Sequence, residues 1–126
     1  MSIAVSAGAM SSFGLSQNIT AHNVANINTD EFKSQRLDLE TGPQGQGVRP
    51  AQIVEDQSMG PLVQRQQAVE NEQGLMVQQE VAVEASNTDL AREITGMIRD
   101  ERAFESNAQA IRSQENLIGV FLDKTV

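Results

Sequence analysis

The clearest pattern in the chain is a stripe of apolar residues in its C-terminal part that recurs in alternating steps of four and three. The ten positions are Leu90, Ile94, Met97, Glu101, Phe104, Ala108, Ile111, Glu115, Ile118 and Leu122, and eight of them are apolar. A heptad stripe of this kind is typical of a coiled-coil helix. It predicts a helix over residues 89–123, about 50 Å long at 1.5 Å per residue. A helix of that length needs partners along its surface.

The start of this helix is marked by four consecutive residues that favour helix N-termini. They are Ser86, Asn87, Thr88 and Asp89. Their side-chain oxygens accept hydrogen bonds from the first free backbone N–H groups of a helix. We expect Thr88 to cap the helix and Asp89 to lie near the positive end of its dipole.

The N-terminal part carries a weaker stripe with the same spacing. It consists of Ile3, Ser6, Met10, Phe13, Gln17, Thr20, Val24 and Ile27. A second face holds Val5, Gly8, Leu15, Ile19 and His22. A helix with apolar groups on two sides is typically buried between neighbours. We expect it to end near residues 26–29, where the periodicity stops.

The middle of the chain has a different composition. It contains all three prolines, a Gly-Pro-Gln-Gly-Gln-Gly run at 42–47 and a high density of Gln. Near-alternate apolar residues predict short strands within 47–55 and 74–83, and Pro50 and Pro61 restrict such strands to sheet edges. The alternative is a partly ordered linker.

These patterns predict a mainly α fold in which long N- and C-terminal helices pair as a coiled coil around a short loop or β-hairpin segment. The predicted parts are residues 1–37, residues 38–85 and residues 86–126. Both terminal parts contribute to a single core domain.

Composition narrows the function. The chain has 126 residues, a net charge of −8, no Cys and one His. It therefore has no disulfide, thiolate zinc site or multi-His metal site, and its acidity argues against nucleic-acid binding. No apolar run is long enough for a transmembrane helix. The first 13 residues lack the basic start of a standard signal peptide, so we expect any export to use another route.

The residues that carry chemistry elsewhere have structural interpretations here. His22 has no companion nucleophile or acid and is expected on a helix face. Glu101 and Glu115 lack a Glu-x-x-His motif, so we expect them to set helix register rather than bind a metal. The Gly-rich run at 42–47 lacks the lysine of a phosphate loop. The sequence predicts no enzyme activity and no cofactor.

Asparagines gather near the end of the predicted N-terminal helix. They are Asn18, Asn23, Asn26 and Asn28. Asn is unfavourable inside helices because its amide competes for backbone groups. The cluster indicates capping or hydrogen bonds to neighbouring chains.

Residues 23–33, Asn-Val-Ala-Asn-Ile-Asn-Thr-Asp-Glu-Phe-Lys, resemble the N-terminal signature of the bacterial flagellar basal-body rod and hook axial protein family. Residues 84–94 and 97–108 are similar to the C-terminal blocks of the same family. The matching signature residues are Asn23, Ala25, Asn26, Thr29, Phe32, Lys33, Ser86, Asn87, Asp89, Arg102 and Asn107. Two signatures in the same order at opposite ends make the resemblance strong.

Four positions depart from the family pattern. Glu31 stands where the family has Gly, Phe104 where it has Tyr, Thr88 where Val is usual and Glu101 where Gln is usual. Because Gly reaches turns that other residues adopt only with strain, we expect the turn at Glu31 to differ.

The short middle segment is similar to that of the short proximal rod type, with Gly47-Val48 and residues 53–56 as its weak markers. The resemblance implies a structural subunit of a hollow periplasmic rod in the flagellar basal body, exported by the type III apparatus without a cleaved signal peptide. The implied partners are copies of itself, other rod proteins and the export apparatus, without nucleic acid or membrane insertion.

We expect helix pairing and assembly to involve Met10, Phe13, Val24, Ile27, Leu90, Ile94, Met97, Phe104, Ile111, Ile118 and Leu122. The alternative is a soluble acidic coiled-coil interaction protein or export chaperone. Such a protein has no need of the Asn-rich signature at 23–33.

Overall fold

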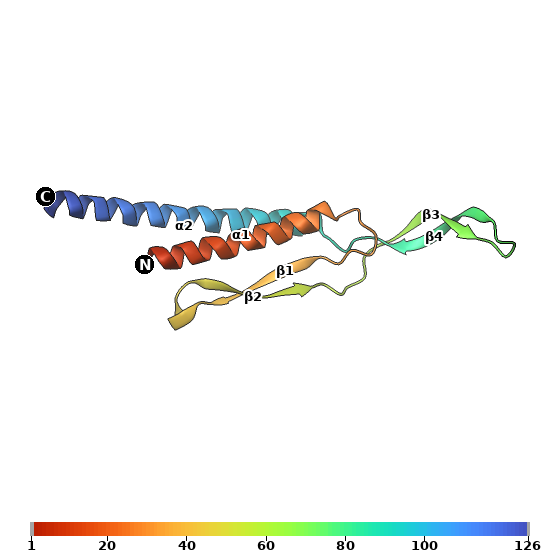
Figure 1. The fold of residues 1–126 in the computed structure, drawn as a ribbon, viewed down its shortest axis with the longest axis horizontal. Helices are drawn as coiled ribbons and strands as arrows, with labels where there is room; N and C mark the ends of the chain where they lie inside the picture. Colours follow the sequence, from red (N-terminus) through yellow and green to blue (C-terminus); the bar gives the residue numbers. More distant parts are fainter. Residues whose placement is uncertain (1, 126) are drawn as a thin grey trace.

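Two helices from the chain ends run side by side, and two β-hairpins lie between them in sequence (Figure 1). The computed structural model describes residues 2–125. Its elements are α1 (Ile3–Ala25), β1 (Gln35–Thr41), a short 3₁₀ turn (Pro43–Gly45), β2 (Val48–Glu55), β3 (Leu62–Glu70), β4 (Met76–Glu84) and α2 (Leu90–Thr125). The molecule is strongly elongated, with the end of α2 at one extreme and the tip of β3–β4 at the other.

The prediction of a mainly α fold is wrong, because 27% of the structure is strand and the fold is mixed α and β. β1 pairs with β2 and β3 pairs with β4, both antiparallel and in separate sheets. Val63 lies opposite Val83 and Val69 opposite Val77 in the second hairpin. The sequence interpretation assigned no strand to 35–41 or 62–70, because Gln and charged residues hide their weak alternation.

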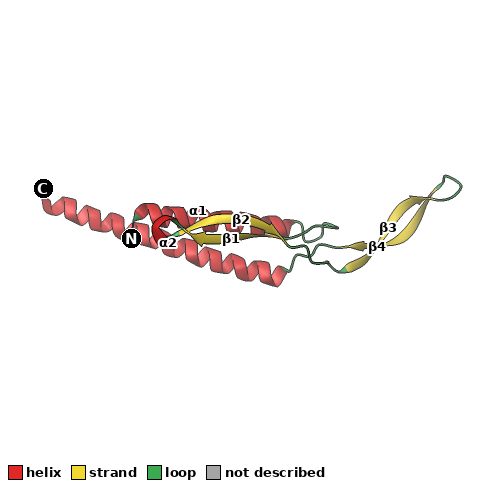
Figure 2. Ribbon diagram, turned by 90° about the horizontal axis from the view of Figure 1, so that it is seen from below, coloured by secondary structure: helices red, strands yellow, loops and turns green. Residues whose placement is uncertain are grey.

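α1 is the middle layer of the helical end. α2 packs on one side of it and the β1–β2 hairpin on the other (Figures 1 and 2). The helices are antiparallel. The buried residues of α1 are mostly small or polar: Ser6, Ala9, Ser12, Ile19, Thr20 and Asn23. Small side chains allow neighbouring backbones to approach closely, but they bury little apolar area.

The intrachain core is correspondingly thin. Within residues 2–125, Ala9 and Ile19 are the only buried hydrophobic residues. The Ser12 hydroxyl is shared between the carbonyl oxygens of Gly8 (3.0 Å) and Val48 (3.3 Å), so it connects α1 to β2. Polar contacts therefore hold much of the arrangement that apolar packing supports in ordinary domains.

The seam between α1 and α2 follows the predicted apolar stripe only in part. Asp100 is the one buried residue of α2. The half-buried residues on the same helix are Glu93, Gly96, Met97, Ala103, Asn107, Ala108, Ala110, Ile111 and Gln114. Their heptad-like spacing is correct for two packed helices, but most of these side chains are small or polar.

Three members of the predicted stripe, Met97, Ala108 and Ile111, are half-buried in this seam, and the remaining members are exposed beside or beyond it. The exposed apolar members are Leu90 (45%), Ile94 (47%), Phe104 (37%), Ile118 (51%) and Leu122 (62%). The periodicity therefore identified a helix correctly, while the stripe it contains is mostly unused within one chain.

Candidate assembly interface

The segments that link the helices to the hairpins meet in one place, which we call the junction: residues 29–35, 56–61 and 84–89, with Asn23. The Asn23 side chain is fully buried. Its Nδ2 donates to the carbonyl oxygen of Gln35 at 2.6 Å, and its Oδ1 accepts from the Gln35 N–H at 2.9 Å. One side-chain amide thus replaces a strand partner and fastens the start of β1 to α1.

Asn87 performs a similar task from the other end of the chain. Its Oδ1 accepts from the Ser34 N–H at 2.7 Å, and its Nδ2 donates to the carbonyl oxygens of Asp56 (2.8 Å) and Ser58 (3.0 Å). Asn87, three residues before α2, therefore holds both ends of the β1–β2 hairpin and the link that follows it. This role was missed by the sequence interpretation, which assigned Asn87 to helix capping.

An ion pair between Lys33 and Glu84 closes the junction. Lys33 also donates to the carbonyl oxygen of Ser58 at 2.8 Å, and Glu84 accepts from the Gly60 N–H at 2.8 Å. These hydrogen bonds from Lys33 and Gly60 hold the pKa of the Glu84 carboxyl below its ordinary value. A Cβ at Gly60 would lie 2.0 Å from the Ala85 carbonyl oxygen, so the close approach requires glycine.

Glu31 adopts the left-handed conformation, with φ of 61°. Its N–H donates to the Glu84 carbonyl oxygen at 2.8 Å, which ties this turn to the end of β4. A residue with a Cβ pays about 1–2 kcal/mol for this conformation. The turn is one that the family's Gly would adopt freely, so the departure at Glu31 changes the energy of the turn.

The start of α2 is capped by Asp89 rather than by Thr88. The Asp89 carboxylate accepts from the N–H groups of Ala91 (3.0 Å) and Arg92 (3.2 Å). Thr88 instead donates its N–H to the Ser86 hydroxyl at 3.1 Å. The prediction that Thr88 caps the helix is therefore wrong, because the capping residue is its neighbour Asp89.

Other signature residues make local contacts at the end of α1. Asn26 donates to the His22 carbonyl oxygen at 2.9 Å and accepts from the Thr29 hydroxyl at 3.0 Å. The rings of His22 and Phe32 meet edge to face at 5.5 Å. The Asn cluster thus organises the chain's own turn through Asn23 and Asn26.

Three signature residues lie outside these contacts. Asn107 donates to the Ala103 carbonyl oxygen within α2 at 2.8 Å. Ala25 is exposed. The Arg102 side chain is 79% exposed and has only a long 3.7 Å contact with Glu105. Arg102 is therefore available to a neighbouring molecule.

The predicted interface residues in the N-terminal part are half-buried: Met10, Phe13 and Val24 on α1, and Ile27 in the turn after it. Met10 and Phe104 line one shallow hollow beside Pro50, and Phe104 lines a second one with Met97. The structure thus brings Met10, Met97 and Phe104 along one flank of the helix pair. Leu90, Ile118 and Leu122 lie farther along α2 and remain exposed.

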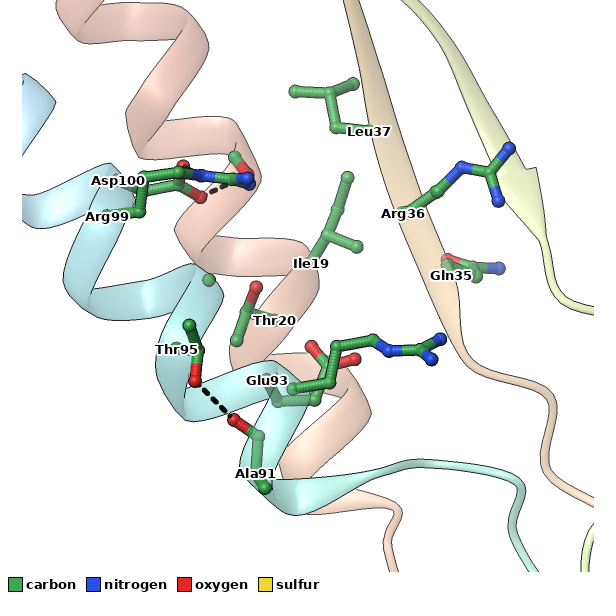
Figure 3. Close-up of a pocket in the computed structure, with 13 residues that line it drawn as sticks. Ile19, Thr20, Gln35, Arg36, Leu37, Ala91, Glu93, Thr95, Arg99 and Asp100 are labelled. Atoms are coloured by element: carbon green, nitrogen blue, oxygen red, sulfur yellow. Dashed lines mark hydrogen bonds and ion pairs between the residues drawn. The ribbon is translucent and has the colours of Figure 1, made fainter.

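A cavity of about 550 Å³, which we call the groove, lies between α1, α2 and β1 (Figure 3). Ile19 and Leu37 give it apolar walls, and Arg36, Arg92 and Arg99 surround it. The sequence interpretation did not anticipate the groove, because its lining residues come from three distant segments.

Asp100 lies at one edge of the groove, with only 3% of its surface exposed. It accepts a hydrogen bond from the Ser16 hydroxyl of α1 and lies 3.7 Å from the Arg99 guanidinium. In residues 2–125 each buried side-chain polar atom has a hydrogen-bond partner. The carboxylate therefore fixes the register between α1 and α2.

The described part of the chain contains no group of three or more His, Asp or Glu residues placed to hold a metal ion. None of its helices has the length and apolar character needed to cross a membrane. The features that organise this structure are the junction, the groove and the exposed apolar residues of α2.

Comparison with known proteins identifies both ends of the chain. Residues 3–33 match a family model described as flagella basal body rod protein, and residues 79–122 match one described as flagellar basal body rod FlgEFG protein C-terminal. A 42-residue segment is 40% identical to the flagellar hook protein FlgE of Escherichia coli K12, and equally to that of Salmonella typhimurium LT2. These matches cover 33% of this chain and 10% of each hook protein.

Proposed function

We propose that this chain, which belongs to the flagellar rod and hook family, is a subunit of the proximal rod of the basal body. The family consists of structural components of the flagellar axis. The finer assignment is supported by the short segment between the helices, where two small hairpins stand in place of a large domain. In this proposal, the subunits assemble through their terminal helices into a helical tube that transmits torque.

The observation that carries this proposal is the exposed apolar surface of α2. Ile94, Ile98, Phe121 and Leu122 are each 47–69% exposed in the single chain. Burial of apolar surface contributes about 25 cal/mol per Å², and the thin intrachain core leaves most of that gain to contacts between molecules. Contacts between unlike surfaces that do not close into a ring produce an open helical assembly.

The junction explains how such an assembly resists twisting. Asn23, Asn87 and the Lys33–Glu84 pair connect both helices to both hairpins through hydrogen bonds. A load applied to one element is therefore passed to the others through short polar contacts rather than a flexible linker. Stiffness of this kind is the property that a torque-transmitting subunit requires.

The proposed location is the periplasmic part of the basal body, reached through the flagellar type III export apparatus. The proposed partners are further copies of the chain and other rod proteins. The remaining alternative, a coiled-coil export chaperone, is less favoured because the junction uses the signature residues to build an axial-protein fold.

The test is to purify hook–basal bodies from the source bacterium carrying an epitope-tagged chain. We expect the tagged chain in the rod fraction and the loss of hooks and filaments when its gene is deleted. Normal flagella in the deletion strain, or hook–basal bodies that lack the chain, would overturn the proposal. Recovery of the chain only in the cytoplasm with an export substrate would support the chaperone alternative.

A further inference from the structure

The C-terminal end of α2 extends past the N-terminal end of α1 (Figure 1), and all residues of segment 115–125 are exposed. We call this segment the overhang. α2 has 36 residues and α1 has 23, so α2 is about 20 Å longer. The overhang is apolar on more than one side: Leu117, Ile118, Val120, Phe121 and Leu122 are all 51–69% exposed. A helix with apolar residues around its circumference is normally buried.

The groove lies near the opposite end of α2, where Ala91, Thr95, Gly96 and Asp100 contribute to its lining. Its walls combine small side chains on α2 with the apolar Ile19 and Leu37 of α1 and β1. Figure 3 shows Ile19 and Leu37 in the space between the helices and β1. The groove therefore has the shape and chemistry to receive a ridge of apolar side chains.

The groove and the overhang each contain a glycine of α2. α2 contains Gly96, which lines the groove, and Gly119, which lies in the overhang. A Cβ at either position would meet nothing within 4 Å in the single chain. A glycine inside a helix is about 1 kcal/mol less favourable than alanine. No contact among residues 2–125 requires glycine at these positions. Close approach of a second molecule would require it and would offset the lost helix stability.

Charge also matches the two surfaces. Arg36, Arg92 and Arg99 outnumber Glu93 and Asp100 around the groove. In the overhang, the acidic Glu115 and Asp123 outnumber the one cation, Lys124. Such complementarity favours the docking of unlike ends over the pairing of like ends.

We propose that the overhang of one copy of this chain seats in the groove of the next copy. This inference rests on the proposed function and names the contact through which the subunits add to one another. Because the two surfaces lie toward opposite ends of α2, each docking event leaves a free groove and a free overhang. The contact is therefore open-ended and produces a polymer rather than a closed dimer.

The absence of cysteine from the chain permits a direct cross-linking test. Thr95→Cys places a thiol in the groove, and single Cys substitutions at 117, 118, 120, 121 and 122 scan the overhang. Mixtures of one groove variant and one overhang variant are oxidised at the concentration at which the wild-type chain polymerises. We expect mixed disulfides that peak on one helical face of the overhang.

The matched control replaces Thr95→Cys with Ser106→Cys, an exposed position on α2 away from the groove. Equal cross-linking to both positions would overturn the proposal. Disulfides formed mainly between two overhangs would also overturn it, because they indicate that a symmetric contact covers these residues.

A second test adds a side chain to the groove at Gly96, and circular dichroism of the free variants checks that the chain still folds. Gly96→Leu adds a large side chain where nothing lies within 4 Å of the Cβ position, and Gly96→Ala is its matched control. Both variants should gain helical stability. We expect Gly96→Leu to need about tenfold more protein to polymerise than Gly96→Ala, as for loss of a central interface contact. Equal polymerisation of the two variants would contradict the proposal.

These tests separate the contact from the function. Suppose that hook–basal bodies contain the wild-type chain and that Gly96→Leu assembles into them equally well. The groove contact is then wrong, and the rod assignment stands. If the wild-type chain is absent from hook–basal bodies, the rod assignment fails whatever the cross-linking gives.

Discussion

The inward and outward faces of α2 differ in the kind of contact that they offer. The inward face is lined by small or polar residues such as Gly96, Asp100 and Ala103, and the Ser16–Asp100 hydrogen bond fixes its position against α1. The outward face carries Ile94, Phe104 and other large apolar side chains that remain exposed. The comparison indicates that polar contacts within the chain set its geometry, whereas most of its large apolar side chains are left for the proposed assembly to bury.

The largest effect is expected on the outward face. Phe104→Asp should lower assembly far more than it lowers the helix content of the free chain, because the ring is 37% exposed and lines only shallow hollows within the chain. In an assembled interface, loss of the ring and burial of a carboxylate would cost about 3 kcal/mol or more. We expect assembly at least ~100-fold weaker, measured by light scattering and by swimming in soft agar.

Phe104→Tyr is the matched control, because it keeps the ring and restores the residue that is usual in the family. It should assemble like the wild-type chain. Normal swimming of the Phe104→Asp strain would show that this face is not part of the interface.

The contacts within the chain are tested by Asn23→Ala, which removes both hydrogen bonds to Gln35 and leaves its two part-buried backbone groups without those partners. Each such group costs about 1–3 kcal/mol. We expect the free energy of unfolding to fall by about 2 kcal/mol or more, with faster amide exchange in β1. Asn18→Ala, at an exposed position of the same helix, should have little effect, and equal effects of the two changes would refute the role of Asn23.

A smaller and opposite effect is expected at Glu31. Glu31→Gly should raise the free energy of unfolding by about 1 kcal/mol, because glycine adopts the left-handed conformation without the Cβ penalty. Thermal unfolding followed by circular dichroism measures this change. Glu31→Ala keeps a Cβ and should give no comparable gain, so stabilisation by alanine would point to the loss of the charge instead.

The smallest effect concerns pH. The pKa of Glu84 is lowered in the folded chain, mainly by its hydrogen bond from Lys33. Its stabilising contribution is therefore complete above the unfolded pKa of about 4.3 and is lost as pH falls through the lower folded value. The melting temperature of the wild type should exceed that of Glu84→Gln at neutral pH, and the difference should shrink on acidification. A difference that is constant with pH would contradict this.

The sequence predicted the two helices because apolar residues that recur in alternating steps of four and three over many residues are a strong local signal. It did not predict which side of α2 faces α1. An apolar stripe predicts that a surface is buried, but it does not show whether the same chain or another chain covers it. The β1 and β3 strands were missed because their apolar residues are sparse among Gln and charged residues. Two-stranded hairpins of this kind depend on their partner strand.

Contacts between residues close in sequence were predicted better than contacts between distant segments. The signature residues were identified from their order along the chain, but the role of Asn87 depends on Ser34, 53 residues away. Capping at Asp89 was within one residue of the expected position. The groove combines α1, β1 and α2, so no local pattern specifies it.

The most direct test compares the accessibility of the two faces in the free and assembled chain. Leu122→Cys reports the apolar stripe that also contains Phe104, Ala103→Cys reports the inward face, and no native thiol interferes. The account predicts that a maleimide labels Leu122→Cys rapidly in the free chain and at least ~10-fold more slowly in purified rods, while Ala103→Cys reacts slowly in both. Equally rapid labelling of Leu122→Cys in rods would contradict the claim that assembly covers the apolar face of α2.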